Sequence, residues 1–461
     1  MIVYFQLSRM RIWLETYGCS LNKFDSYIIR YYLISEGFSI SDSIDKADII
    51  IVNSCGVKKQ TEDRIISRLK KLRALYKDKK LLLVGCLPLI NLRRIKNETS
   101  VDGILGPSPG YKVVEAIEKI INGEYIEDLS QSSLLYKPIF SPDKIVSIPI
   151  GISVGCLDKC SFCGTRLARG NLKSYPPDYI IKLITNHVKH GVREFYLTSQ
   201  DTGAYGFDLK PRLNIISLLK MIDSLEENNF IVRIGMMNPR WVYKFIDDLI
   251  EIFRSSTKFY HFLHIPVQSG SDKVLKIMNR GHGVEEYIES VRKLRKEVGK
   301  HFTIMTDIIV GHPGEDEEDF EATVEIVKES QPDYINISQF FPRPNTPSAF
   351  MKKIPTNIVK YRSTILSQVS DEVLYKRNML WVGWKGAILL NELGRRGDRI
   401  LGRNYAYKIF AVDRDDLNIG DIIHIKAVKA YTTWLYGEYR KKSSSFLDLW
   451  IHSYSKSYIA Y

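Results

Sequence analysis

The amino-acid sequence predicts an α/β protein built from three successive parts. Strand-like and helix-like runs alternate in the first part of the chain, which is typical of a parallel sheet. A second and longer series of alternating runs follows, and the chain then changes to short β-type runs separated by Gly and Asp. We therefore expect an N-terminal parallel α/β domain over residues 10–125, a central partial (β/α)6 barrel over 146–379 and a small antiparallel β-barrel over 380–440.

Three cysteines occupy equivalent positions in the N-terminal part. Its strand-like runs are residues 11–17, 47–53, 80–85 and 101–106, and its helix-like runs are residues 21–36, 57–77 and 111–122. Cys19, Cys55 and Cys86 each lie just beyond the carboxyl end of one of the first three strands. Ligands of open parallel sheets bind at that edge, so we expect the three thiols to meet in space. A single cysteine is more often a buried apolar residue, but three in the same position favour a three-cysteine cluster.

A second group of three cysteines lies close together in sequence. The stretch Gly155–Gly170 reads GCLDKCSFCGTRLARG and follows the apolar run Ile148–Val154. It places Cys156, Cys160 and Cys163 in a CxxxCxxC spacing. Three thiolates can hold three irons of a [4Fe–4S] cluster and leave the fourth iron open to a small molecule. The alternative is zinc, which usually takes four ligands in paired spacings, and no fourth ligand is spaced for it here.

The six cysteines thus divide into two groups of three, which two clusters explain and three disulfides do not. We therefore expect the protein to work in a reducing compartment, where disulfides are rare. The N-terminus lacks a signal-peptide pattern, and the longest apolar runs are far shorter than a membrane span. The sequence therefore predicts a cytoplasmic protein without a membrane partner.

Positive charge is concentrated in one stretch. The chain carries a formal net charge of +13. Gly56–Lys96 contains thirteen Lys or Arg against three Asp or Glu, an excess of ten positive charges. A helix face that is merely solvated would also be charged, but the position beside Cys55 and Cys86 favours a surface for a polyanion such as RNA.

The central part contains six strand-like runs, each followed by a helix-like run. The strand-like runs are Ile148–Val154, Glu194–Thr198, Phe230–Gly235, Phe262–Val267, Phe302–Val310 and Tyr334–Phe340. An active site is expected at the carboxyl ends of such strands. The candidates there for cofactor binding are Thr198, Gln200, Asp201, Arg233, Gln268 and Asp307. The alternatives are that neighbouring side chains such as His264 belong to the core and that the segment GHPGE is only a turn.

The C-terminal runs ILLNEL, YKIFAV, IIHIKAV and WLYGEY suggest a barrel of OB-like type. Arg399, Arg403, Tyr405, Tyr407 and Lys408 alternate charge with aromatic rings, which suits RNA phosphates and bases, although a solvated surface would look similar. Residues 123–145 lose periodicity and are predicted to be a linker between domains. Residues 441–461 receive no assignment.

The order of the motifs resembles the methylthiotransferase family of radical S-adenosylmethionine enzymes. The motifs are ETYGCSLNKFDS, NSCGV, VGCLP, GCLDKCSFCGTRLARG, LTSQDTGAYG, HIPVQSGSD, TDIIVGHPGE and QFFPRPNTP. Within that family, TSQDTGAYG and FFPRPNTP most resemble the archaeal and eukaryotic branch, which methylthiolates C2 of N6-threonylcarbamoyladenosine beside the anticodon of tRNA. The resemblance implies a methylthiotransferase domain, a radical SAM core and a TRAM domain that binds RNA.

The resemblance also implies the cofactors and their ligands. It assigns Cys156, Cys160 and Cys163 to the catalytic [4Fe–4S] cluster that converts S-adenosylmethionine to a 5′-deoxyadenosyl radical. It assigns Cys19, Cys55 and Cys86 to an auxiliary [4Fe–4S] cluster that carries sulfur, which a second S-adenosylmethionine methylates. A radical route is needed because carbon 2 of adenine has no leaving group, and such chemistry belongs to cofactors. The implied partner is tRNA, while the reductant protein and the sulfur donor remain unknown.

Two alternatives stay open from sequence. A methylthiotransferase acting on an aspartate of a ribosomal protein would use the same cofactors. A non-catalytic iron–sulfur protein that binds RNA or transfers electrons would need neither an open iron nor glycine-rich barrel loops.

Overall fold

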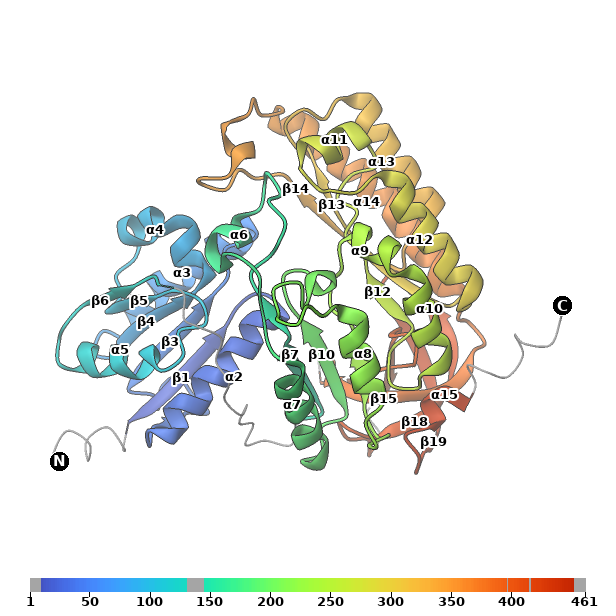
Figure 1. Cartoon of the computed structure of the whole chain (residues 1–461). Helices are drawn as coiled ribbons and strands as arrows, with labels where there is room; N and C mark the ends of the chain where they lie inside the picture. The colour runs from blue at the N-terminus through green and yellow to red at the C-terminus, as the bar shows by residue number, and fades with distance from the viewer. Residues whose placement is uncertain (1–9, 131–144, 396, 414–415, 452–461) are drawn as a thin grey trace. The chain divides into compact units, whose positions relative to one another are not determined.

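The computed structural model of the chain describes residues 10–130, 145–395, 397–413 and 416–451 (Figure 1). Contacts between residues group the chain into two compact units. The first unit combines the N-terminal residues with Pro149–Tyr175 and Phe341–Phe350. The second unit contains the other described residues after 144. Among the described residues, no helix has the length and apolar character that a membrane span requires.

The first unit contains a parallel sheet of six strands, which confirms the predicted N-terminal fold. The strands, in spatial order, are β2 (Ser39–Ile40), β1 (Arg11–Thr16), β3 (Ile49–Ser54), β4 (Lys80–Gly85), β5 (Gly103–Leu105) and β6 (Ile126–Asp128). Helices α2 (Ser20–Ser35) and α5 (Lys112–Ile121) pack together, as do α3 (Lys59–Leu75) and α4 (Cys86–Glu98). Every residue of β3 is buried, as expected of a central strand in a parallel sheet that helices cover on both faces.

The prediction of a linker from residue 123 was wrong for the three residues of β6. These residues pair in parallel with β5, so that Ile126 lies opposite Gly103 and Asp128 lies opposite Leu105. A three-residue edge strand is too short to show the alternation from which strands are predicted. Residues 131–144 of the predicted linker lie outside the described residues.

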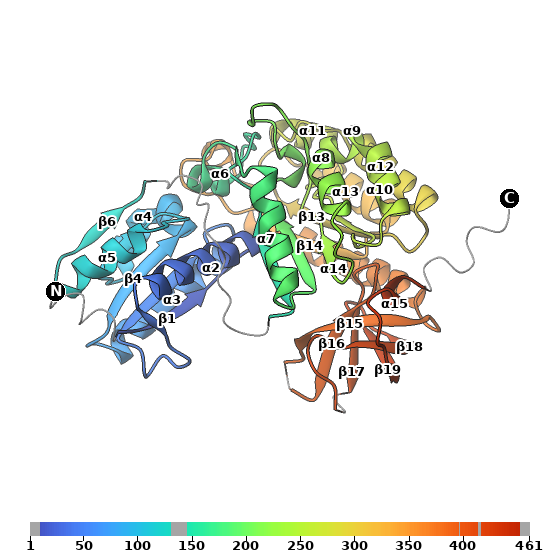
Figure 2. The ribbon, with the colours of Figure 1, turned by 60° about the horizontal axis from the view of Figure 1, so that its bottom comes forward.

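The second unit contains the parallel strands of the central part. These are β10 (Glu194–Thr198), β11 (Ile231–Arg233), β12 (Phe262–His264), β13 (Thr303–Val310) and β14 (Tyr334–Gln339), and β7 (Ser147–Gly151) begins in this unit. Helices α7 (Pro177–Lys189), α8 (Ile215–Asp223), α10 (Ile246–Ser255), α12 (Val284–Glu297) and α13 (Glu317–Ser330) follow the strands in turn (Figure 2). Six strands with intervening helices confirm the predicted partial (β/α)6 barrel.

The C-terminal part is a closed five-stranded barrel, drawn in orange and red in Figure 2. Its strands are β15 (Lys385–Leu393), β16 (Arg399–Arg403), β17 (Ile409–Asp413), β18 (Ile422–Ala430) and β19 (Leu435–Lys442). The predicted small antiparallel barrel is confirmed except for one parallel pair, β17 with β19. Strand β16 was not predicted from the sequence. Helix α15 (Asp448–Ile451) was not predicted either, although its residues Leu449 and Trp450 are buried in the barrel core.

The small barrel shares its core and a buried charge cluster with the strands of the second unit. Tyr260 and Phe262 belong to the same apolar cluster as Phe410 of β17. The carboxylate of Asp333 is fully buried and lies 3.1 Å from cationic nitrogens of Lys408, Arg377 and Arg295. Burial alone would raise the pKa of Asp333, but the three cations outweigh it and hold that pKa well below its usual value.

This packing corrects one prediction. Tyr405 and Lys408 were expected on an RNA-binding surface, but both are buried, with Lys408 fully enclosed. The alternation of charge and aromatic rings in this segment arises because its side chains pack against the central strands and neutralise Asp333.

We predict that Asp333→Asn lowers the free energy of unfolding by about 3–5 kcal/mol, because it leaves buried cations without their counter-charge. Chemical denaturation measures this change. The control is Asp247→Asn, which removes a carboxylate whose side chain is 82% exposed and pairs with Lys293; it should change stability by at most about 1 kcal/mol. Equal effects of the two substitutions would contradict the role given to Asp333.

Candidate functional site

The structure confirms that Cys19, Cys55 and Cys86 follow the carboxyl ends of neighbouring strands. Cys19 precedes the first turn of α2, Cys55 follows β3 directly, and Cys86 begins α4. The sulfur atoms of Cys19 and Cys86 lie 3.9 Å and 3.8 Å from the same atom, Oδ1 of Asn22. Gly18 has a φ of +107°, and a Cβ atom on it would lie only 2.9 Å from the sulfur of Cys55. The three thiols therefore converge at one edge of the sheet.

Asn22 connects the loops that carry these thiols. Its side chain is fully buried. The amide nitrogen Nδ2 donates hydrogen bonds of 2.9 Å to the carbonyl oxygens of Tyr17 and Ser54. Tyr17 lies two residues before Cys19, and Ser54 lies directly before Cys55. Sequence reasoning missed Asn22, although it lies one helical turn after Cys19 in the motif that carries the resemblance.

The second set of thiols lies on a closed loop of the same unit. Strands β8 (Ser153–Val154) and β9 (Lys173–Ser174) pair antiparallel at its neck. Gly155 has a φ of +79°, and a Cβ atom there would lie 1.9 Å from the carbonyl oxygen of Asn171. Only glycine fits at this position, because any side chain would force the neck open. Cys156, Cys160 and Cys163 on this loop are half-buried.

The number and type of the ligands suit iron–sulfur clusters better than zinc. No disulfide joins any of the six cysteines in the described part of the chain. Each set supplies three thiols, and cysteine is the usual ligand of iron–sulfur clusters. A structural zinc ion usually takes four protein ligands.

Burial controls the protonation of two thiols of the first set, Cys55 and Cys86. It raises the pKa of the Cys86 thiol to about 12 and also raises the pKa of Cys55. Without a bound metal these thiols are neutral near pH 7. Metal binding must therefore displace their protons, which is the usual coupling between metal affinity and thiol ionisation.

Two buried arginines complete the first set. Arg169 ends α6 (Gly164–Arg169), the helix that follows Cys163 directly, and its Nε lies 3.2 Å from the sulfur of Cys86. Arg343 lies in the segment Phe341–Phe350 of this unit, pairs with Glu62 at 2.5 Å and donates to the carbonyl oxygens of Gly56 and Val57. Arg343 thereby fixes the loop that follows Cys55. Both arginines lie in the motifs that carry the resemblance, but sequence alone gave no signal that Arg169 contacts the Cys86 thiol or that Arg343 binds the loop after Cys55.

Thr198, Gln200 and Asp201 lie where the sequence places them, at the end of β10 and in the loop that follows. The carboxylate of Asp201 accepts hydrogen bonds of 3.1 Å from the backbone nitrogens of Gly203 and Asn238 and from Nε1 of Trp241. Asp201 therefore holds its own loop in shape. A contact of these three residues with a cofactor stays a prediction.

Gln268, which lies four residues beyond β12, contacts Asp307, which lies within β13. The backbone nitrogen of Gln268, a residue with a φ of 75°, donates to the carbonyl oxygen of Asp307 at 2.9 Å. Oδ1 of Asp307 accepts a 2.7 Å hydrogen bond from Asn336, and its Oδ2 lies 3.0 Å from Nε2 of His264. The structure thus brings together a polar group on three neighbouring strands. Its binding of a cofactor also stays a prediction.

Arg233 has different surroundings from the other candidates. Its guanidinium lies 4.8 Å from the ring centre of Phe262 and 5.3 Å from that of Tyr407, within the range of cation–π contacts. Tyr407 belongs to the C-terminal barrel. These contacts support a packing role between the strands and that barrel beside the predicted cofactor role.

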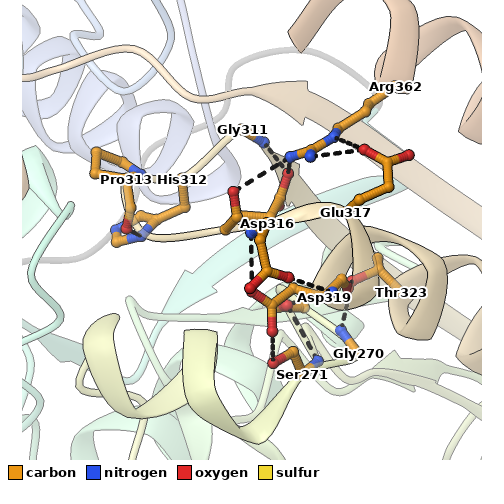
Figure 3. Close-up of polar contacts among 12 residues, drawn as sticks. Gly270, Ser271, Gly311, His312, Pro313, Asp316, Glu317, Asp319, Thr323 and Arg362 are labelled. Carbon is orange, nitrogen blue, oxygen red and sulfur yellow. Dashed lines mark hydrogen bonds and ion pairs between the residues drawn. The ribbon is translucent and has the colours of Figure 1, made fainter. Parts of the chain in front are cut away.

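The segment GHPGE is a turn whose polar groups bond to one another (Figure 3). The buried carboxylate of Glu315 accepts hydrogen bonds from the backbone nitrogen of Gly311 at 3.0 Å and from Arg362 at 2.8 Å. Arg362 also pairs with Glu317 at 2.8 Å. The side chain of Glu315 is committed to these contacts, as the alternative of a simple turn predicts.

Acidic residues from outside the basic stretch neutralise part of its charge. Five of its thirteen cations pair with acidic residues outside the stretch; they are Arg68, Lys70, Arg73, Arg94 and Lys96. Lys59 pairs with Asp63 inside the stretch, and Lys79 donates to the backbone carbonyl oxygen of Asp45. The basic surface for a polyanion is therefore smaller than the sequence count suggests.

The comparisons with known proteins agree with this architecture. Residues 150–327 match the radical SAM superfamily, and residues 11–106 match uncharacterized protein family UPF0004. The fold is similar to that of the radical S-adenosylmethionine methyltransferase TsrM from Kitasatospora setae, with a TM-score of 0.53 and 14% identity over 74% of this chain and 77% of that chain. The fold and the CxxxCxxC loop define a radical SAM enzyme.

Curated relatives identify the family within this class. A probable threonylcarbamoyladenosine tRNA methylthiotransferase of Pyrococcus horikoshii is 38% identical over 93% of this chain and 99% of its own length. The corresponding protein of Archaeoglobus fulgidus is 39% identical over 93% and 98%. The human threonylcarbamoyladenosine tRNA methylthiotransferase is 33% identical over 93% of this chain and 74% of its own length. The chain belongs to the threonylcarbamoyladenosine tRNA methylthiotransferase family.

We predict that Gly18→Ala removes roughly half of the iron that the reconstituted protein binds, because a Cβ at that position would displace Cys55 and disrupt one of two clusters. Iron per chain measures this loss. The control is Gly123→Ala, because Gly123 also has a positive φ, +83°, but open space around it. If both variants keep the iron content of the unmodified chain, the three thiols do not converge on a cluster.

Proposed function

We propose that this chain transfers a methylthio group to C2 of N6-threonylcarbamoyladenosine in tRNA. The observation that carries the proposal is the presence of two separate three-cysteine sets in one chain of this family. One set would suffice for radical generation, and the second is what sulfur transfer requires. The relatives named above carry that substrate in their names.

In this proposal Cys156, Cys160 and Cys163 hold one [4Fe–4S] cluster, and Cys19, Cys55 and Cys86 hold the other. When bound, these groups supply the one-electron cleavage of S-adenosylmethionine and the sulfur that is transferred. Three ligands per cluster leave one iron of each without a protein ligand. The protein contributes position, because Asn22, the glycine-dependent loops and the buried arginines fix where the thiols lie.

We infer three domains, with the boundaries 10–125, 146–379 and 380–440 expected from sequence. The C-terminal domain would be TRAM-like and bind RNA. Its boundary at residue 380 does not separate two cores, because Tyr260 and Phe262 pack with residues of the barrel. Removal of the barrel would also expose Asp333, so point substitutions on its surface are the better test of RNA binding.

An aromatic and basic surface of this barrel suits RNA. We define it as Arg399, Lys429, Tyr431, Trp434 and Tyr436. The rings of Tyr431 and Trp434 stack with centroids 4.0 Å apart. The guanidinium of Arg399 lies 5.5 Å from the rings of Trp434 and Tyr436. Stacked rings beside cations are the arrangement with which proteins hold unpaired bases and phosphates.

We predict that the double substitution Arg399→Glu/Lys429→Glu weakens tRNA binding and makes its affinity less dependent on salt, because phosphate contacts are lost. The dissociation constant as a function of salt concentration tests this. The control Lys296→Glu makes a charge reversal on α12, outside this surface, at a side chain that is 79% exposed. Equal affinities and salt slopes in the double variant and the control would place the RNA surface elsewhere.

The activity itself is tested by mass spectrometry of nucleosides. The protein is reconstituted anaerobically with iron and sulfide, and then supplied with reductant, S-adenosylmethionine and tRNA bearing threonylcarbamoyladenosine. We predict that the methylthio nucleoside forms. Cys160→Ala should abolish cleavage of S-adenosylmethionine, whereas Cys55→Ala should retain cleavage and lose the methylthio product.

Leu75→Ala is the control, because its side chain is 71% exposed on α3 and contacts neither thiol set. Residual deoxyadenosine from Cys160→Ala would contradict the role of the CxxxCxxC loop. Methylthio product from Cys55→Ala would contradict the role of the first set. If the unmodified protein forms deoxyadenosine but no methylthio nucleoside, the substrate is another molecule, and a ribosomal protein is the next to test.

A further inference from the structure

Arg169 is a buried cation in the first thiol set, although it belongs to the segment that carries the second. Only 2% of the surface of Arg169 is exposed. Each of its three nitrogens has a partner. Nε donates to the sulfur of Cys86 at 3.2 Å, Nη1 donates to the hydroxyl of Ser108 at 3.0 Å, and Nη2 donates to Asn22 at 2.7 Å and to Asp25 at 2.6 Å.

The contacts of Arg169 are not explained by stability alone. A buried ion pair such as Arg169–Asp25 contributes about as much as a well-packed apolar pair, because desolvation offsets the attraction. The pair is held in a defined geometry, since the other oxygen of Asp25 accepts a 2.7 Å hydrogen bond from Ser108. This arrangement leaves the Nε–H of Arg169 directed at a thiol. Arginine suits such a position because it stays protonated at all accessible pH values and presents its donors in a rigid plane.

We propose that Arg169 is a positioning residue for the group held by Cys19, Cys55 and Cys86. It donates a hydrogen bond to the sulfur of Cys86 and places a permanent positive charge beside the group. Hydrogen bonds to cluster sulfurs and nearby charge both shift the reduction potential of an iron–sulfur cluster. A positive charge stabilises the more negative, reduced form, so Arg169 raises the potential.

The position of Arg169 in the chain has a further consequence. Cys163 directly precedes α6 and Arg169 ends it, so the segment with the second thiol set also supplies the counter-charge of the first. The first site is therefore complete only when that segment is folded. This inference rests on the proposed function, because it requires a cluster at Cys19, Cys55 and Cys86.

The test measures the potential of this cluster alone. The parent is the full chain with Cys156→Ala, Cys160→Ala and Cys163→Ala, reconstituted with iron and sulfide. A redox titration followed by electron paramagnetic resonance gives its midpoint potential. We expect Arg169→Gln to shift the midpoint to a more negative value and Arg169→Lys, which keeps the charge, to shift it less. The control Arg73→Gln removes a cation of the same unit that pairs with Asp102 at 2.6 Å and contacts no cysteine.

Each outcome decides the proposal. A midpoint in Arg169→Gln equal to that in Arg73→Gln, at full iron content, overturns it. Loss of iron in Arg169→Gln but not in Arg169→Lys, with the melting temperature of the iron-free protein unchanged, supports it. Loss of iron in both variants together with a lower melting temperature of the iron-free protein assigns Arg169 a structural role only and overturns it. If the parent itself binds no iron, the cluster assignment of the proposed function fails, and the role of Arg169 fails with it.

Discussion

The convergence of three thiols at the carboxyl edge of β1, β3 and β4 is the constraint on which the first unit depends. A parallel sheet brings loops that are distant in sequence to one edge, and burial there makes unpaired charge costly. Asn22 satisfies backbone carbonyls from two of these loops and also accepts a hydrogen bond from Arg169. The site is therefore built by polar groups that each have a partner, which fixes the sulfur atoms without a disulfide.

Much of this arrangement could be predicted from the sequence. The alternation of strands and helices placed Cys19, Cys55 and Cys86 at one edge, because strand order along the chain matches neighbouring positions in the sheet. The arginines around the thiols could not be predicted, since Arg169, which contacts Cys86, and Arg343, which binds the loop after Cys55, come from segments far away in sequence. Nothing in the residue types distinguishes such an arginine from one on the surface.

In the C-terminal region, residues that the sequence predicted on an RNA-binding surface are buried instead. The alternation of Arg, Tyr and Lys around residue 405 suggested an RNA surface, but Lys408 neutralises the buried Asp333 instead. Periodicity shows that a strand has two faces, and it does not show which face another element covers. The charge count of residues 56–96 is correct but does not include Glu15 and Glu127, which lie outside that stretch in sequence and pair with it in space.

We propose that the chain builds two separate iron–sulfur sites. The most direct test of this claim is the iron and sulfide content of three reconstituted proteins: the unmodified chain, a variant with Cys19, Cys55 and Cys86 replaced by Ala, and a variant with Cys156, Cys160 and Cys163 replaced by Ala. Two [4Fe–4S] clusters predict about eight irons in the unmodified chain and about four in each variant. A variant that keeps all of the iron, or an unmodified chain with only about four irons, would contradict the account.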